Sequence, residues 1–401
     1  MDTKGILKRA EIEFDVVLLL VASLTMLLTG ALLFPVSVGR LPYYENGLYG
    51  LFLFIFAFQM VALGRTPFGD APRSKALLAA GVVVAGMGII TCFIPEIFSR
   101  IPRIVLSICF GLGGVSLLVQ MVFAEDKLPR WRQYGGIFRH LIASCAAVYV
   151  LSALIGLLIF RKDLLSTPMT AVVVLLMGFS LTYLAITLQK IYVAYPEAVH
   201  EPEGDLDLPI GRVTILMTGL FLVILGVLLV PVSLGKLPFS GSAQLGLLMV
   251  NLAIQILATG DSPIGPFPRT WLMMIIGLAF ASLGATSCII PGILVAPLTL
   301  LIGFMNILGG VLNLKRILVP IIKGSSQGVG PVPPIVVRLN LVQIAMNVVS
   351  ITFGVSMLVH NLIPPLIIGV VLASNGGLLL YLVRLLYVLD GLQKARSQPA
   401  S

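Results

Sequence analysis

The sequence is short of charge. Only 11% of its 401 residues are Asp, Glu, Lys or Arg, whereas 58% are hydrophobic, and an ordinary soluble domain carries roughly 25% charged residues. A water-soluble chain of this length would divide into two or three domains, each with a polar surface. The composition therefore excludes a soluble protein and indicates that most of the chain lies in a lipid bilayer.

Chemically reactive side chains are scarce as well. No Asp or Glu lies near the middle of a long apolar run, and the three histidines fall between runs or at their ends. The four cysteines lie within the runs or at their ends, without the spacing of metal ligands or of a disulfide framework. Because ionisable groups inside a membrane mark catalysis or ion coupling, we expect no enzyme activity, no catalytic residue, no metal and no cofactor.

Long apolar runs are what the sequence has in abundance. Twelve stretches have the composition and length of membrane-spanning helices. They cover residues 16–34, 48–64, 76–95, 104–124, 141–160, 169–188, 213–232, 243–259, 271–291, 293–314, 339–359 and 362–383. Open strands would leave backbone donors unpaired in hydrocarbon, and the runs lack the alternation of a barrel. The predicted fold class is all-α, a polytopic bundle of transmembrane helices.

The basic residues sort by loop. Of the 26 Lys and Arg, 20 lie at the two termini and in every second loop, and they form no basic face of a soluble domain, which excludes nucleic acid as a partner. By the positive-inside rule, both termini face the cytoplasm. We expect a multi-pass protein of a bacterial inner membrane. The charged residues 1–15 lead into the first run without a cleavage site, which predicts an uncleaved signal anchor.

The chain repeats itself at a spacing of 196 residues. PVSVGRLPY at residues 35–43 returns as PVSLGKLPF at 231–239, and 16 of 40 positions are identical between residues 34–73 and 230–269. Many identities are Gly and Pro, which a general excess of Leu and Val does not explain. Six predicted helices separate equivalent positions. Because six is even, we expect two parallel six-helix repeats related by an axis along the membrane normal.

The predicted domains follow from this repeat. Residues 1–195 form the first six-helix repeat, and residues 210–401 form the second. The segment between them, 196–209, reads PEAVHEPEGDLDLP and contains five acids, three prolines and no base. Such a composition is typical of a hydrated linker, here on the cytoplasmic side.

Each repeat reads as three helical hairpins. The odd helices end in a proline or a turn, as in LVILGVLLVPVS, and the even helices carry a seam of small residues, as in LLIGFMNILGGVLNLKR. This pattern resembles the HdeD-like family of small bacterial membrane proteins, which is associated with acid resistance and has six spans in three hairpins. The resemblance covers each half in turn, best over residues 213–316, and implies a doubled family fold without catalytic residues.

Amides are the main polar groups of the predicted helices. Two interpretations are open: hydrogen bonds that hold helices together, or a neutral polar cavity near the midplane with a symmetric pair of glutamines. The candidates are Gln59, Gln255, Asn251, Asn306, Asn347 and Asn375.

A few bases are placed to meet lipid headgroups. Arg40 and Lys236 occupy the same position in the two copies of the PVS motif, against the charge bias, which predicts headgroup contact or carbonyl capping. Arg130, Trp131 and Arg132 combine bases with an aromatic ring, a combination typical of the headgroup zone. Membrane lipids are the expected partners; other membrane proteins or a second copy of the chain are alternatives.

Two functions are compatible with these features. The first is a non-enzymatic inner-membrane protein of HdeD-like type that acts in envelope or acid-stress tolerance or as a subunit of a membrane complex. The second is a transporter or channel for a small neutral or weakly polar solute, with its pathway between the two halves.

Overall fold

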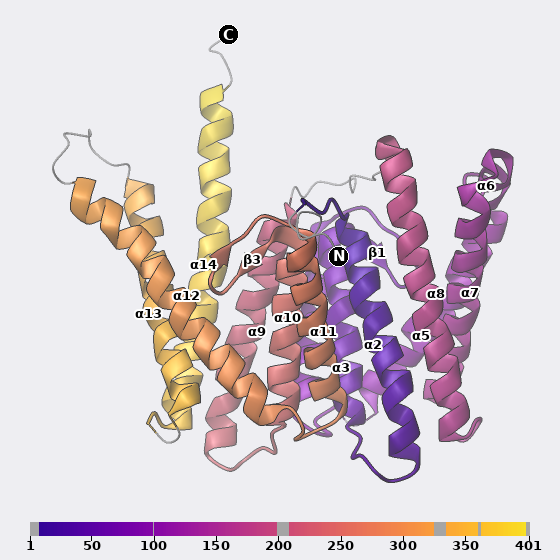
Figure 1. The fold of residues 1–401 in the computed structure, drawn as a ribbon, viewed down its shortest axis with the longest axis horizontal. Coiled ribbons are helices and arrows are strands. Elements are labelled where there is room, and N and C mark those ends of the chain that lie inside the picture. The colour runs from indigo at the N-terminus through magenta and orange to yellow at the C-terminus, as the bar shows by residue number, and fades with distance from the viewer. Residues whose placement is uncertain (1–7, 99, 199–207, 325–333, 360–361, 398–401) are drawn as a thin grey trace. The chain divides into compact units, whose positions relative to one another are not determined.

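The computed structural model describes residues 8–98, 100–198, 208–324, 334–359 and 362–397. Within them the chain forms thirteen α-helices (Figure 1). Their bounds are α2 Phe14–Ser37, α3 Glu45–Phe58, α4 Lys75–Phe93, α5 Ile101–Phe123, α6 Leu128–Tyr134, α7 Ile137–Phe160, α8 Thr167–Ala194, α9 Ile210–Ser233, α10 Gly241–Thr259, α11 Trp271–Ile289, α12 Val295–Gly324, α13 Pro334–Leu358 and α14 Pro365–Ser397. A π-helical turn, η1 Gln59–Leu63, extends α3, and a 3-10 turn, η2 Pro196–Ala198, follows α8.

Twelve of these helices are long and apolar enough to cross a membrane, counting η1 with α3. The exception is α6, which has only seven residues. The predicted all-α, multi-pass membrane fold is confirmed, and each of the twelve predicted spans coincides with one long helix.

Equivalent helix ends are built in the same way 196 residues apart. Ser74 and Thr270 precede α4 and α11, and each side-chain oxygen accepts a hydrogen bond from the backbone N–H three residues on, at 3.2 and 3.4 Å. This is the N-cap arrangement that Ser and Thr favour. Gly64 and Gly260 end η1 and α10 with left-handed φ values of 66° and 79°, a conformation that glycine adopts without strain.

The PVS motifs form glycine caps at the ends of α2 and α9. The backbone N–H of Arg40 donates to the carbonyl of Pro35, and that of Gly39 donates to Val36, each at 2.9 Å. The second copy repeats both bonds, from Lys236 to Pro231 and from Gly235 to Val232. The pattern is a Schellman cap with glycine in the left-handed conformation.

One expectation for this motif, that the proline ends the helix, needs correction. Pro35 and Pro231 lie inside the last turn, and the helices end two residues later, at Ser37 and Ser233. A proline removes only its own N–H, so the chain continues until glycine turns it. The carbonyl capping predicted at Arg40 and Lys236 is made by their backbone N–H groups, and both side chains are exposed.

The loops after η1 and α10 are short β-hairpins. Strand β1 Arg65–Thr66 pairs with β2 Gly69–Asp70, and β3 Asp261–Ser262 pairs with β4 Gly265–Pro266, both antiparallel. The first hairpin brings Arg65 opposite Asp70, whereas the second places Asp261 opposite Pro266. The same local fold therefore carries different charges in its two copies.

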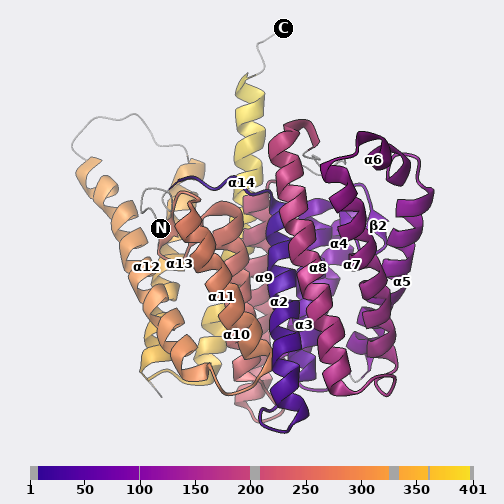
Figure 2. The ribbon, with the colours of Figure 1, turned by 45° about the vertical axis from the view of Figure 1, so that its right-hand side comes forward.

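By packing, the chain forms two compact units. One contains α2 to α8 together with α10 and α11; the other contains α9, α12, α13, α14 and the β3–β4 hairpin. In the first unit α8 lies along α2 and α7 lies along α5. The α10–α11 hairpin packs against α2, α3 and α4, and it lies on the opposite side of α2 from α5 and α7 (Figure 2). The division into domains at 196–209 stays a prediction, and most of the predicted linker, residues 199–207, lies outside the described residues.

The α3–α4 and α10–α11 hairpins meet in a reciprocal contact within the first unit. The backbone N–H of Tyr44 donates to the carbonyl of Ile289, and that of Ser240 donates to the carbonyl of Phe93, both at 2.9 Å. Each donor and each acceptor differs from its counterpart by 196 positions. Exchange of this kind is the signature of a two-fold contact, in which one patch meets a copy of itself.

Candidate functional site

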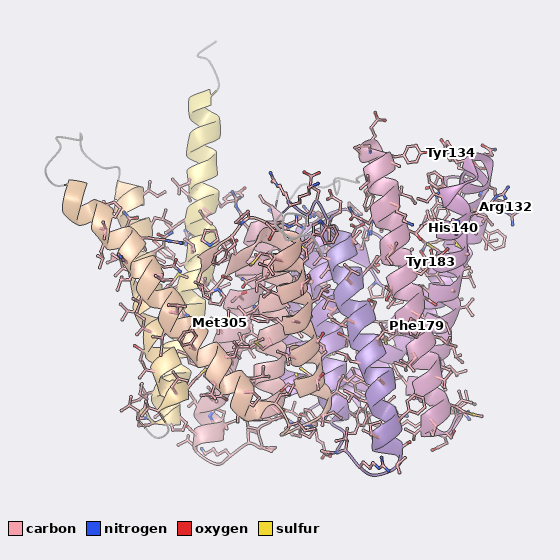
Figure 3. All side chains as sticks on the ribbon, in the orientation of Figure 1. Arg132, Tyr134, His140, Phe179, Tyr183 and Met305 are labelled. Atoms are coloured by element: carbon pink, nitrogen blue, oxygen red, sulfur yellow. The ribbon has the colours of Figure 1, made fainter. Side chains whose placement is uncertain are left out.

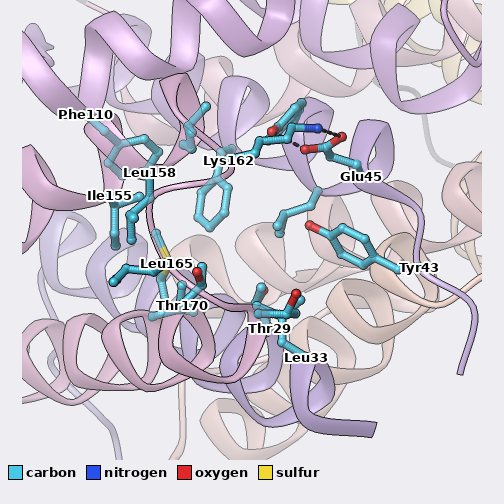
Figure 4. A pocket seen from close by; sticks show the side chains of 17 residues that line it. Thr29, Leu33, Tyr43, Glu45, Phe110, Ile155, Leu158, Lys162, Leu165 and Thr170 are labelled. Carbon is cyan, nitrogen blue, oxygen red and sulfur yellow. Dashed lines mark hydrogen bonds and ion pairs between the residues drawn. The ribbon is translucent and has the colours of Figure 1, made fainter. Parts of the chain in front are cut away.

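Two cavities lie one after the other along the helices α2, α3, α5, α7 and α8. One has a volume of about 210 Å³ and includes Lys162 at its end; we call it the Lys162 cavity (Figure 4). The other has a volume of about 350 Å³ and includes Arg65 at its end; we call it the Arg65 cavity. Both are lined by α2, α3, α5, α7 and α8.

On α2, α3, α7 and α8, the lining residues pass in order along the helix from one cavity to the other. On α2, Asp15 to Ala22 line only the Arg65 cavity, whereas Thr29 and Leu33 line only the Lys162 cavity. At about 1.5 Å per residue, the interval from Asp15 to Leu33 spans roughly 27 Å, close to the roughly 30 Å of a bilayer's hydrocarbon core. The two cavities together therefore extend over nearly the whole membrane thickness.

Three side chains border both cavities and separate them: Met26, Phe52 and Phe110. The rings of Phe52 and Phe110 meet edge to face, with centroids 5.6 Å apart, a favourable geometry for an aromatic pair. Phe110 also contacts the ring of Phe56 at 5.2 Å, and its carbonyl accepts a hydrogen bond from Ser152 at 2.9 Å. We call these three residues the central barrier.

An ion pair lies at the end of the Lys162 cavity. The Nζ atom of Lys162, in the α7–α8 loop, lies 2.5 Å from Oε2 of Glu45 at the start of α3 (Figure 4). The hydroxyl of Tyr49 donates to the other oxygen of the same carboxylate. Arg103 holds the end of α7 by donating to the carbonyls of Ile159 and Phe160, at 2.8 and 2.7 Å. The pair thus ties the α7–α8 loop to α3 beside the cavity.

A larger charged cluster lies at the other end. Asp15, with only 7% of its surface exposed, accepts hydrogen bonds from the hydroxyl of Tyr192 and, at 3.4 Å, from Arg65. Arg65 also lies 3.3 Å from Asp70 across the β1–β2 hairpin. Burial lowers the pKa of the Arg65 guanidinium, but the Asp15 carboxylate and its neighbours raise that pKa above its ordinary value. The cluster is therefore a fixed arrangement of charges that links α2, α8 and the hairpin.

Of the six predicted polar candidates, one lines a cavity. Gln59 borders the Arg65 cavity. Asn306 and Asn347 each donate to the carbonyl four residues earlier in their own helix, at 2.9 and 2.8 Å, as expected of satisfied helical amides. The remaining three, Gln255, Asn251 and Asn375, line neither cavity. A polar cavity shared by Gln59 and Gln255 stays a prediction.

The predicted headgroup residues lie in two kinds of environment. Arg40, Lys236, Arg130 and Arg132 are exposed (Arg132 in Figure 3), and their contact with lipid stays a prediction. Trp131, on α6, is half-buried and lines the Arg65 cavity instead.

The residues at the ends of the cavities were missed by sequence reasoning. They sit at helix ends and in a hairpin, where charge is ordinary, so nothing in their composition singled them out. A comparison of the two copies would have singled them out, because the charges differ between the copies. The positions 196 residues after Asp15, Glu45, Arg65 and Asp70 hold Gly211, Gly241, Asp261 and Pro266. Three of the four charges are therefore missing from the second copy, and the fourth position, Asp261, has the opposite sign.

The histidines and cysteines that the structure describes form no second candidate site for metal binding or catalysis. His140 shares a hydrogen bond of 2.6 Å with the hydroxyl of Tyr183 between α7 and α8 (Figure 3). Over the described residues, no three His, Cys, Asp or Glu side chains are grouped as a metal site would require. Two cysteines line the Arg65 cavity, Cys109 and Cys145, whereas Cys92 and Cys288 are completely buried.

No known family model, no curated protein and no solved structure matches the chain. The resemblance to the HdeD-like family therefore rests on the hairpin motifs of the sequence.

Proposed function

We propose that the protein is a transporter or channel for a small, uncharged or weakly polar solute, and that the solute passes through the Lys162 and Arg65 cavities. The observation that carries this proposal is the alignment of two cavities on either side of the central barrier, over nearly a membrane thickness. No Asp, Glu, Lys, Arg or His side chain lines either cavity near the barrier, because the acidic and basic residues of the linings lie at the outer ends. A charged solute would pay a large desolvation cost there, which favours an uncharged one.

This route differs from the one that the sequence suggested. The pathway was expected between the two halves, where parallel repeats commonly place their sites. The cavities that support the proposal are lined only by residues between Asp15 and Leu188, which all belong to the first half of the chain. A role in acid or envelope stress stays a prediction from the HdeD-like resemblance.

We also infer that the chain is an internally duplicated protein of two six-helix repeats. The reciprocal bonds at Tyr44 and Ser240, the matching Schellman caps and the matching hairpins support this inference. With both termini on the cytoplasmic side of an inner membrane, as the charge bias favours, the Arg65 cavity opens toward the cytoplasm and the Lys162 cavity toward the opposite side.

Flux through the central barrier tests the transport proposal. Purified protein is reconstituted into vesicles, and the entry of urea, glycerol and benzamide is followed by light scattering against empty vesicles. We expect Phe110→Ala to change the entry rate of at least one solute severalfold and Phe110→Trp to lower it. The matched control is Asn306→Ala, at the equivalent position of the second copy. Equal rates in all four proteins and in empty vesicles would exclude the proposal.

A further inference from the structure

The wall of the Arg65 cavity is rich in aromatic rings. Of its 28 lining residues, five are aromatic: Phe52, Phe56, Phe110, Trp131 and Tyr149. Aromatic residues form only 8% of the chain. The five rings come from α3, α5, α6 and α7, so they face the space from several sides. Rings so placed can contact a flat ring edge to face or in offset stacks, each pair contributing about 0.5–1.5 kcal/mol.

The polar groups of this cavity favour an uncharged ligand. Its lining contains two carboxylates, Asp15 and Asp70, and two cations, Arg65 and Lys127, so the formal charges cancel. All four residues lie at the end of the cavity, away from the barrier. A ligand with a net charge would therefore find no uncompensated opposite charge in the interior.

One amide lies between the charged end and the aromatic wall. Gln59 lines the cavity from the first turn of η1, and its side chain has no hydrogen-bond partner among the residues that the structure describes. An amide carries both donors and an acceptor, so it can bind a hydroxyl, carbonyl or amide of a ligand. The indole N–H of Trp131 offers a second donor nearer the charged end.

We propose that the Arg65 cavity binds an uncharged aromatic molecule that carries a hydrogen-bonding group, with its ring against Phe56 and Phe110 and its polar group at Gln59. This inference rests on the proposed function, in which it names the class of solute. The cavity volume of about 350 Å³ lies within the roughly 300–1,000 Å³ typical of small-molecule sites. The Lys162 cavity, at about 210 Å³, is smaller.

The tryptophans of the chain provide a direct test of binding. There are two of them, and Trp271 lies on α11, outside the lining of the cavity. In the Trp271→Phe protein, fluorescence reports Trp131 alone. We expect a saturable change of Trp131 emission with benzamide, and none with cyclohexanecarboxamide, which has the same amide but no aromatic ring. Benzoate and benzylamine, which are charged, are expected to give none.

Two variants separate binding at this site from partition into detergent. The Trp131→Phe protein, in which Trp271 is the reporter, is expected to show no saturable response. Gln59→Leu, in the Trp271→Phe background, is expected to weaken benzamide about threefold to tenfold, the effect of one lost hydrogen bond. The inference is overturned if cyclohexanecarboxamide or benzoate binds the Trp271→Phe protein as tightly as benzamide does. It is also overturned if benzamide gives no saturable response in the Trp271→Phe protein. If benzamide binds but no solute enters the vesicles, the transport proposal is excluded and the binding site is retained. If a solute enters the vesicles but benzamide does not bind, the binding site is excluded and the transport proposal is retained.

Discussion

At the start of α3, the Glu45 carboxylate holds two partners at once, the ammonium of Lys162 and the hydroxyl of Tyr49. The side chains of Lys162 and Glu45 are 45% and 33% exposed, and such pairs contribute at most about 1 kcal/mol to stability. Their importance is positional, because they join a loop to a helix beside a cavity.

Removal of this pair is expected to affect flux more than stability. In Lys162→Met, the α7–α8 loop loses its tether to α3, so we expect faster solute entry in the vesicle assay and a thermal midpoint within a few degrees of the original protein. Lys236→Met, which removes an exposed lysine outside the cavities, is the control. An unchanged entry rate in Lys162→Met would mean that the pair does not restrict the cavity.

The two carboxylates around Arg65 are expected to differ in their effect on stability. Asp15→Asn leaves Arg65 without its buried partner, and we expect a loss of roughly 1–3 kcal/mol in the free energy of unfolding. Asp70 has 69% of its side chain exposed, so Asp70→Asn is expected to change this free energy by less than about 0.5 kcal/mol. Thermal unfolding in detergent compares the two variants; equal losses would contradict the buried role of Asp15.

At the scale of elements, close helix contacts depend on individual glycines. A β-carbon placed on Gly88 of α4 would lie 2.8 Å from the carbonyl oxygen of Gly50 and 2.9 Å from the backbone nitrogen of Phe54, both on α3. Backbone atoms cannot rotate away, so the two helices would have to separate. A β-carbon on Gly377 of α14 would meet nothing within 4 Å.

These two glycines therefore predict opposite effects of the same substitution. Gly88→Ala is expected to lower the free energy of unfolding by about 1–3 kcal/mol through overpacking. Gly377→Ala is expected to leave it unchanged or raise it by up to about 1 kcal/mol, because alanine is the better helix former. Thermal unfolding of both variants under identical conditions gives the comparison; a stable Gly88→Ala protein would mean that α3 and α4 are less closely packed.

The positions of the long helices could be predicted from the sequence. The apolar runs located all twelve long helices, since the length of a span is set by the bilayer. The cavities could not be predicted, because hydropathy does not say which helices face one another. Gln59, one of the predicted polar candidates, lines the Arg65 cavity, whereas Gln255 lines neither cavity, so the symmetry of the sequence did not indicate which glutamine would.

At the scale of the whole molecule, the proposed pathway has its two ends on opposite sides of the membrane. A cysteine at the exposed position 40, in Arg40→Cys, is expected to react with an impermeant maleimide from the non-cytoplasmic side. Arg132→Cys is expected to react only once the membrane is opened. Labelling of intact cells and of lysed cells distinguishes them, and the reverse pattern would invert the orientation inferred from the charge bias.

Passage of solute through the Lys162 and Arg65 cavities can be tested at Cys109. This cysteine lines the Arg65 cavity, whereas Cys92 and Cys288 are completely buried in α4 and α11. Reconstituted protein is treated with methyl methanethiosulfonate, and the modification of each cysteine is followed by mass spectrometry alongside the solute entry rate. Because Cys145 lines the same cavity, the test uses the Cys145→Ala background. We expect Cys109 to react before the buried pair and entry to slow in step with its modification, whereas the protein that carries both Cys109→Ala and Cys145→Ala is expected to keep its entry rate after treatment. An entry rate that stays constant while Cys109 is fully modified would contradict a route through this cavity.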